Sequence, residues 1–88
     1  MAPYKVLIAP SALKDIERLS QDLARRVEKR IDALSVQPFP PRVKKLGGSQ
    51  YTYRVSMGDY RVVYDVDTKA ALVLILRVGH RREVYRKR

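Results

Sequence analysis

The dipeptide Gly58-Asp59 lies between two segments that are rich in β-branched and aromatic residues, residues 51–57 and 60–67. A glycine followed by an aspartate between two such segments predicts a β-hairpin with a two-residue loop. A loop of this length also sets the register of the two strands, and a shift of one residue would move every side chain to the opposite face. The expected cross-strand pairs are Met57 with Tyr60, Ser56 with Arg61, and Val55 with Val62.

Other segments predict a strand and two helices before this hairpin. Residues 4–8 have the pattern of a first strand, which Pro10 ends. Ser11 is expected to be the N-cap of a short helix that runs through Leu19, and Ser20 the N-cap of a second helix that reaches about Ser35. Apolar residues recur at helical spacing in both segments.

Residues 38–41 contain three prolines around Phe39, and we expect a stiff connector on which Phe39 covers the core. Residues 71–78 predict a further, more apolar strand. The order of strand, two helices and three strands predicts an α+β fold with two helices packed on a twisted, mainly antiparallel sheet.

Length and composition limit the classes of function. The chain has 88 residues and is expected to form one domain, residues 1–88, with a thin core that buries roughly 60% of the unfolded surface. It has no cysteine, which excludes disulfides and thiolate metal sites. No apolar run approaches the roughly 20 residues that span a bilayer, so no membrane partner is expected and a cytoplasmic location is predicted.

The chain is strongly basic, with 19 lysines and arginines against 9 acidic residues and a formal net charge of +10. This charge favours anionic partners, because binding releases counterions and long-range attraction speeds encounter. The second predicted helix carries basic residues away from its apolar stripe, and these form either a solvated face or a contact with nucleic acid. These residues are Arg25, Arg26, Lys29 and Arg30.

Strand alternation places Arg54, Ser56 and Arg61 on one face of the hairpin. The opposite face, which should pack on the helices, carries Tyr53, Val55, Met57, Tyr60, Val62 and Tyr64. Two neighbouring arginines cost free energy unless an anion or a carboxylate lies between them. A phosphate could contact both arginines, whereas Asp65 on the same face is the alternative, internal partner of Arg61.

The face on which Arg77 lies depends on the connection before the last predicted strand. A three-residue loop at Thr68-Lys69-Ala70 would put Arg77 on the face of Arg61, and a two-residue loop would put it on the other face. The sequence leaves both alternatives open.

The end of the chain places the only histidine, His80, between Gly79 and two arginines, Arg81 and Arg82. Gly79 permits a sharp bend after the last strand. Histidine is the side chain best suited to proton transfer near neutral pH, although a lone histidine can equally be structural. Tyr85 follows, either as a functional residue or as a core aromatic. Few carboxylates lie in this region, and no plausible set of metal ligands occurs there.

Four stretches together resemble the RelE/ParE superfamily of bacterial type II toxins, on its RelE side. They are Val43-Lys44-Lys45-Leu46 followed by Gly48, then Tyr53-Arg54, then Gly58-Asp59-Tyr60-Arg61-Val62-Val63-Tyr64, and finally Gly79-His80-Arg81-Arg82-Glu83-Val84-Tyr85. The resemblance covers essentially the whole chain. It implies a compact α+β fold and an endoribonuclease that cuts messenger RNA in the ribosomal A site without a metal or other cofactor, and so inhibits translation.

The resemblance also implies partners. One is a cognate antitoxin whose acidic or amphipathic C-terminal segment wraps the toxin. The others are the ribosome with its mRNA, and operator DNA that is reached only through the toxin–antitoxin complex.

Residue roles follow from the same resemblance. Arg61 matches the arginine that holds the scissile phosphate, Arg81 the arginine that stabilises charge during cleavage, and Tyr85 a tyrosine that stacks on a base or helps to move a proton. Arg54 and Ser56 stand where a well-known member has two strand lysines, and His80 stands at another lysine position. Further substrate-binding candidates are Lys44, Lys45, Arg77 and Arg82.

These roles suggest that the 2′-hydroxyl of RNA attacks the adjacent phosphorus, with Arg61 and Arg81 supplying positive charge and His80 acting as the general base. Serine in place of the second lysine weakens the case for activation of the nucleophile. Two other functions stay open. One is a ParE-like inhibitor that binds DNA gyrase, and the other is a degenerate toxin that binds only antitoxin and operator DNA.

Overall fold

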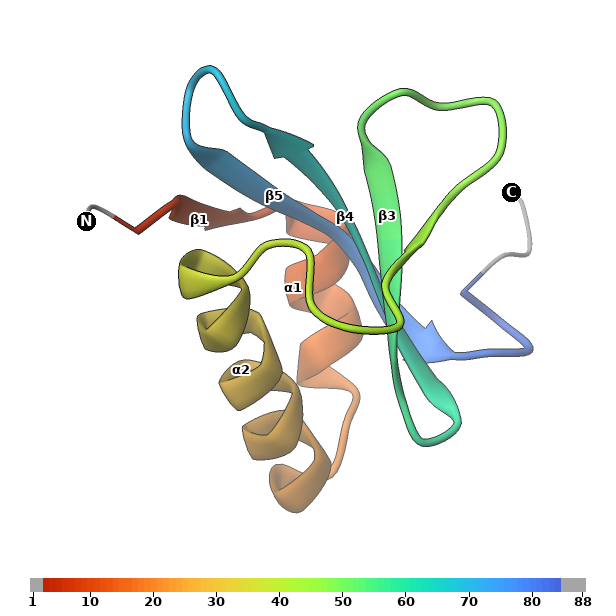
Figure 1. Cartoon of the computed structure of the whole chain (residues 1–88). Helices are drawn as coiled ribbons and strands as arrows, with labels where there is room; N and C mark the ends of the chain where they lie inside the picture. The colour runs from red at the N-terminus through yellow and green to blue at the C-terminus, as the bar shows by residue number, and fades with distance from the viewer. Residues whose placement is uncertain (1–2, 85–88) are drawn as a thin grey trace.

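The computed structural model describes residues 3–84, which form two helices on one face of a five-stranded sheet (Figure 1). The order of the strands in the sheet is β1-β5-β4-β3-β2, with β1 parallel to β5 and the other neighbours antiparallel. The predicted α+β fold, with two helices on a mainly antiparallel sheet, is therefore confirmed. The elements are β1 (Lys5–Ile8), α1 (Pro10–Glu17), α2 (Gln21–Val36), β2 (Lys44–Lys45), β3 (Thr52–Met57), β4 (Tyr60–Asp67) and β5 (Leu72–His80).

The two helices begin differently. Ser20 is the N-cap of α2 as predicted, and its hydroxyl accepts a hydrogen bond from the Leu23 N–H at 3.2 Å. The predicted N-cap of α1 is wrong, because α1 begins at Pro10 and its N-cap is Ala9. Proline suits the first turn of a helix, where its missing N–H would have no partner. The Ser11 hydroxyl instead donates to the carbonyl oxygen of Leu76 at 2.7 Å.

The central hairpin has the predicted register, with Met57 opposite Tyr60 and Ser56 opposite Arg61. Gly58 has a positive φ of 61°, which a glycine adopts without steric cost. The short strand β2 was not predicted. It pairs only with Tyr53 and Arg54, and so covers the edge of β3 near the beginning of that strand.

The core lies between the helices and the face of the sheet that carries the predicted apolar side chains. Its largest fully buried members are Tyr64, Leu34, Ile75, Val27, Val62 and Val73. The Tyr64 hydroxyl donates to the carbonyl oxygen of Pro38 at 2.8 Å, which ties the proline connector to the sheet. Burial of this phenol, with a smaller contribution from Tyr53, raises the pKa of Tyr64 to about 12. Phe39 contacts Tyr53 edge-on, with ring centroids 5.1 Å apart.

Beyond the end of β1, helix α1 takes over the edge of β5. The strand β1 pairs with β5 only from Leu72 to Ile75. Further along, the buried Asp15 accepts a hydrogen bond from the Val78 N–H at 2.9 Å, and it accepts two more from the Arg77 guanidinium at 2.8 and 3.2 Å. An unpaired strand edge leaves backbone groups without partners. The Asp15 side chain of α1 therefore takes the place of a neighbouring strand at Val78.

The connection between β4 and β5 resolves the alternatives for Arg77. Asp67 pairs with Leu72, so four residues connect the strands, and neither predicted loop length is correct. Further along, Val63 pairs with Arg77 and Tyr64 with Ile75, so that β5 contains one extra residue, Leu76. This irregularity shifts the register by one residue, and Arg77 consequently comes from the same face of the sheet as Arg61.

We predict that Asp15→Ala lowers the free energy of unfolding by about 2–3 kcal/mol, because the Val78 N–H would be buried without an acceptor and Arg77 would lose its partner. Urea unfolding measures this change. Glu17→Ala, on an exposed position of the same helix, is the matched control. Equal effects of the two substitutions would contradict the assigned role of Asp15.

We also predict that stability falls as the pH rises from about 10 toward 12, because the pKa of Tyr64 is raised in the fold from the ordinary value of 10.0 to about 12. A raised pKa contributes stability that is fully present below the unfolded value and is lost as the pH rises through the folded value. Unfolding across this window should show a smaller loss for Tyr64→Phe. Tyr51→Phe, at a side chain that is 60% exposed, should leave the loss unchanged.

Candidate nucleic-acid interface

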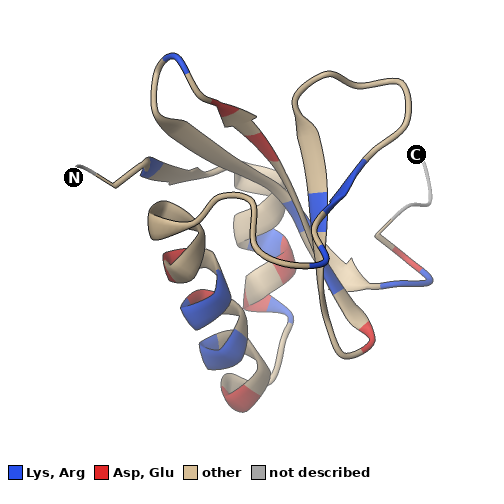
Figure 2. Cartoon of the chain, in the orientation of Figure 1, with Lys and Arg blue, Asp and Glu red and all other residues tan. Residues whose placement is uncertain are grey.

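The face of the sheet that the helices leave uncovered, called here the open face, carries a group of basic residues near the β3–β4 turn. In the register, Lys44 lies opposite Arg54, Arg54 opposite Val63, and Val63 opposite Arg77. The next row places Ser56 opposite Arg61 and Arg61 opposite Gly79. The sheet therefore brings together candidates that lie more than thirty positions apart in the sequence (Figure 2).

Arg61 is held by its own turn. One terminal nitrogen of its guanidinium, Nη1, donates to the carbonyl oxygens of Gly58 and Tyr60, at 3.0 Å each. Its Nε is buried, and among residues 3–84 it has no hydrogen-bond partner. A buried donor without a partner is rare and costs free energy. The fold thus fixes the position of a half-buried cation on the open face.

The alternative internal partner of Arg61 is otherwise engaged. The Asp65 carboxylate accepts a hydrogen bond from the Thr52 hydroxyl at 2.6 Å, and these two residues face each other across β3 and β4. The Thr52 hydroxyl in turn accepts from Ser49 at 2.7 Å. The Asp65 carboxylate is therefore hydrogen-bonded to Thr52, which Ser49 of the preceding turn holds in place, and not to Arg61.

Arg81 follows β5 and is anchored at the same turn. Its backbone N–H donates to the carbonyl oxygen of Asp59 at 2.7 Å, and its side chain is exposed. Because Gly58 and Asp59 hold Arg61 and Arg81 respectively, the structure brings both residues to one end of the sheet. The bend of the chain comes after Gly79, which is itself part of β5, and a Cβ at position 79 would lie 3.7 Å from the Cβ of Val84.

His80 lies on the other face of the sheet. It pairs with Tyr60 in the register, and its ring stands edge-on to the Tyr60 ring with centroids 5.6 Å apart. Its Nδ1 accepts a hydrogen bond from the Arg82 N–H at 3.1 Å, which assigns the proton of the neutral ring to Nε2. In this arrangement Nδ1 of His80 is engaged by the backbone, and the ring orders the residues directly after β5.

The other candidates are placed unevenly. Arg77 is bound to Asp15, and hydrogen bonding to that carboxylate raises the pKa of the Arg77 guanidinium further above its ordinary value. Lys44, Lys45 and Arg82 are exposed, and Arg54 is half-buried. Tyr85 lies outside the described residues.

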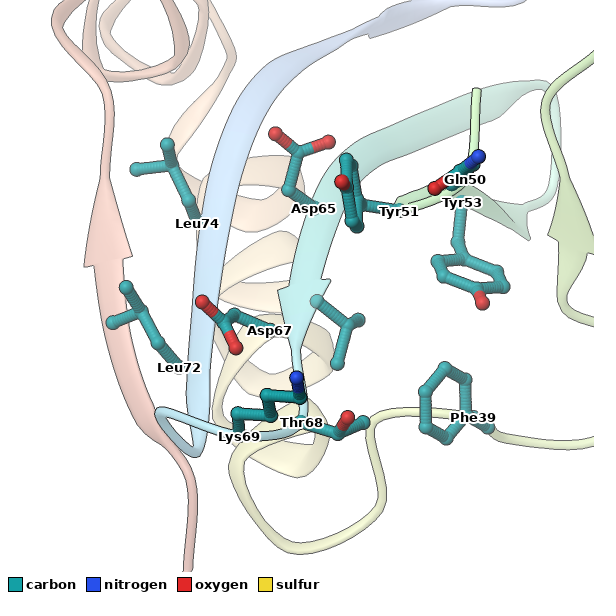
Figure 3. Close-up of a pocket in the computed structure, with 11 residues that line it drawn as sticks. Phe39, Gln50, Tyr51, Tyr53, Asp65, Asp67, Thr68, Lys69, Leu72 and Leu74 are labelled. Carbon is teal, nitrogen blue, oxygen red and sulfur yellow. The ribbon is translucent and has the colours of Figure 1, made fainter. Parts of the chain in front are cut away.

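The opposite end of the open face is apolar and acidic, and the sequence analysis did not single it out. A hollow of about 670 Å³ lies there (Figure 3). Leu72 and Leu74 of β5 line it together with Tyr51, Asp65 and Asp67. Leu7, 43% exposed, pairs with Leu74 beside it. The alternation of leucines at positions 72, 74 and 76 is the sequence signal that could have revealed a second apolar face on this strand.

Two general features bear on the class of site. Among residues 3–84, no group of three or more histidine, cysteine, aspartate or glutamate side chains has an arrangement that could hold a metal ion. None of the described helices is long and apolar enough to cross a membrane.

Comparisons with known proteins agree with this architecture. The model of the family described as "ParE toxin of type II toxin-antitoxin system, parDE" matches residues 6–85. The chain is 35% identical over 89 residues to Toxin RelG of Mycobacterium tuberculosis, covering 97% of this chain and 99% of that protein. It is 29% identical to Putative toxin RelE1 of Methanocaldococcus jannaschii, over 94% of this chain and 96% of the relative.

Solved structures show the same fold. The archaeal RelE–RelB complex from Pyrococcus horikoshii OT3 superposes with a TM-score of 0.80 at 32% identity, covering 92% of this chain and 98% of the matched chain. The isolated Escherichia coli RelE toxin superposes with a TM-score of 0.76 at 27% identity, over 93% and 90% of the two chains. This chain therefore belongs to the RelE/ParE family and is a toxin of the type II toxin–antitoxin class.

Proposed function

We propose that the protein is a ribosome-dependent endoribonuclease that cuts messenger RNA in the A site and so stops translation in the cytoplasm. The observation that carries this proposal is Arg61, a half-buried cation whose Nη1 is held by the carbonyl oxygens of Gly58 and Tyr60. The arginine lies in a basic part of the open face, where its charge and its planar guanidinium suit a phosphodiester. Similarity to toxins named RelE and RelG supports the same reading.

In the proposed reaction the 2′-hydroxyl of the RNA gives up its proton and attacks the adjacent phosphorus. The bond between phosphorus and the 5′-oxygen of the next nucleotide breaks, that oxygen takes up a proton and leaves as a hydroxyl, and a 2′,3′-cyclic phosphate remains. Arg61 binds the scissile phosphate, and Arg81, anchored at the same turn, adds positive charge as the phosphorane-like transition state forms. Tyr85 is proposed to stack on a base or to aid proton transfer. His80 is proposed to position the segment that carries Arg81, because its Nδ1 is already bonded to the Arg82 N–H.

Neighbouring residues would bind the RNA chain on either side of this point. Arg54 and Lys44 face each other across β3 and β2, and Ser56 lies opposite Arg61, so these three side chains surround the proposed phosphate site. Ser56 offers a hydroxyl and no positive charge. The rate must then depend strongly on placement of the message by the ribosome, and free RNA should be cut poorly.

The apolar hollow at the other end of the open face fits an antitoxin segment better than RNA. Apolar side chains that gather on a surface mark protein-binding sites, and here the exposed Tyr51 and Leu7 lie beside the half-buried Leu72 and Leu74. Similar toxins from Mycobacterium tuberculosis and Pyrococcus horikoshii have been solved in complexes with antitoxins. We propose that a cognate antitoxin wraps this protein and that operator DNA is bound only by the complex.

We predict that Arg61→Ala and Arg81→Ala each lower cleavage by about 100-fold, the usual cost of one lost transition-state donor. The assay translates a message in a purified bacterial system and maps the 5′ ends of the cut products. Arg25→Ala, an exposed arginine on α2, is the control and should cut at the wild-type rate. Wild-type rates in both site variants would refute the assignment.

A second prediction tests the nucleophile. A message with a single 2′-deoxynucleotide on the 5′ side of the cut point should resist cleavage there, because the attacking hydroxyl is absent. Cleavage at the neighbouring ribonucleotide codons serves as the internal control. Unchanged cutting at the modified position would exclude attack by the 2′-hydroxyl.

The same preparation tests the gyrase alternative, to which the match with a family of ParE toxins gives weight. A supercoiling assay with DNA gyrase would detect inhibition by binding. Inhibition of gyrase without codon-phased cuts would replace the nuclease proposal, and inactivity in both assays would indicate a degenerate toxin.

A further inference from the structure

A basic groove runs along the outer edge of β3, next to the site described above, and it shares Lys44 and Ser56 with that site. It has a volume of about 780 Å³ and lies between α2, the segment of residues 41–44 that leads into β2, and residues 55–58 at the end of β3. Four cationic side chains from these segments line it, namely Arg26, Arg30, Arg42 and Lys44. Figure 2 shows basic residues on α2, on the connector that crosses in front of the sheet, and on β3. We call this feature the edge groove.

Its charge is not neutralised within the described part of the chain. No aspartate or glutamate lines the edge groove, and among residues 3–84 no carboxylate forms an ion pair with any of the four cations. Converging like charges raise the free energy of the fold, and an anion in the groove would lower it. Three of the four are arginines, whose planar forks suit phosphate oxygens.

The backbone favours a fixed arrangement on two sides of the edge groove. Arg26 and Arg30 are four residues apart in α2, so they lie on the same side of that helix. Arg42 has a positive φ of 71°, a conformation that non-glycine residues rarely adopt. Arg26 and Arg30 of α2 and Arg42 of the connector thus come from separate segments and line the same groove.

The edge groove adjoins the proposed cleavage site. Ser56 and Gly58 line it, and these residues also contact Arg61, since Ser56 pairs with it across the hairpin and the Gly58 carbonyl accepts from its Nη1. Within the described chain, β2 pairs only with Tyr53 and Arg54, so no strand covers the outer edge of β3 from Val55 to Met57. A polymer with regularly spaced negative charges could thus pass from Arg61 into the groove.

We infer that the edge groove binds the sugar–phosphate backbone of single-stranded RNA that flanks the bond at Arg61. The inference rests on the proposed function, because that function identifies the ligand as RNA. It adds a second contact region, on α2 and on the connector. Continuity with the Arg61 site favours RNA over an acidic peptide, which would need no such continuity. The contact is to phosphates, so it should show little base preference.

The test measures binding of a labelled 2′-O-methyl oligouridylate of about 12 nucleotides to the full chain by fluorescence anisotropy at several salt concentrations. This RNA cannot be cleaved, so binding is read separately from chemistry. Arg26→Gln with Arg30→Gln should weaken binding by about 10-fold and reduce the salt slope by about 1.4, since each lost contact with a phosphate of single-stranded RNA removes roughly 0.7.

The matched control is Arg25→Gln with Lys29→Gln, which removes the same charge at the same spacing from the same helix. Arg25 and Lys29 are exposed and do not line the edge groove. This variant should bind within about 3-fold of the wild type and keep most of the salt slope. Equal weakening by both variants would show attraction to net charge alone and would overturn the inference, as would wild-type binding by the groove variant.

An oligoglutamate peptide of similar charge separates the two kinds of occupant. Both competitors are compared at equal concentrations of negative charges. If the peptide displaces the labelled RNA at a lower concentration than unlabelled RNA does, the inference is overturned in favour of an acidic protein segment. The reverse order supports it.

Cleavage in the translation system keeps the two proposals distinct. Groove-dependent binding without any codon-phased cutting would leave the edge groove as an RNA site and refute the nuclease. Normal cutting by wild-type protein with no groove-dependent binding would refute the groove alone.

Discussion

The bond between Asp15 and the edge of β5 is the interaction on which the rest of the structure depends. One carboxylate on α1 accepts from the Val78 N–H and from the guanidinium of Arg77. It thereby replaces the strand that β1 is too short to provide and fixes the last part of β5. The strand β5 ends at His80, and Arg81 follows directly. The position of the proposed cleavage site therefore depends on an aspartate of α1 that binds the edge of β5.

The open face of the sheet is divided by charge and polarity. Basic residues lie near the β3–β4 turn, around Arg61, whereas Leu72, Leu74, Asp65 and Asp67 lie toward the β4–β5 connection. A net charge of +10 attracts any anionic partner. The separation of basic from apolar side chains on the open face lets the protein distinguish between such partners. The proposed RNA site lies at the basic end and the proposed antitoxin site at the other, so a single partner that covered both ends would compete with the proposed RNA substrate.

The chemistry available at the basic end is electrostatic. The held guanidinium of Arg61 and the anchored Arg81 can stabilise negative charge on phosphorus, but no described side chain there is arranged as a general base, since Nδ1 of His80 is engaged by Arg82. Positioning by the ribosome and the intrinsic reactivity of the 2′-hydroxyl would then supply much of the rate. This division of labour explains why so small a domain can support the proposed cleavage.

The sequence by itself determined the central hairpin, the register of Ser56 with Arg61, and the capping of α2 by Ser20, because each depends on residues close together in the chain. Only the tertiary structure decided the partner of Arg77, since Asp15 lies 62 residues away and nothing local specifies that contact. The same holds for the extra residue Leu76, for the side of the sheet that His80 occupies, and for the edge groove of α2 and β3. These features arise from packing between distant segments, which a local pattern of propensities does not contain.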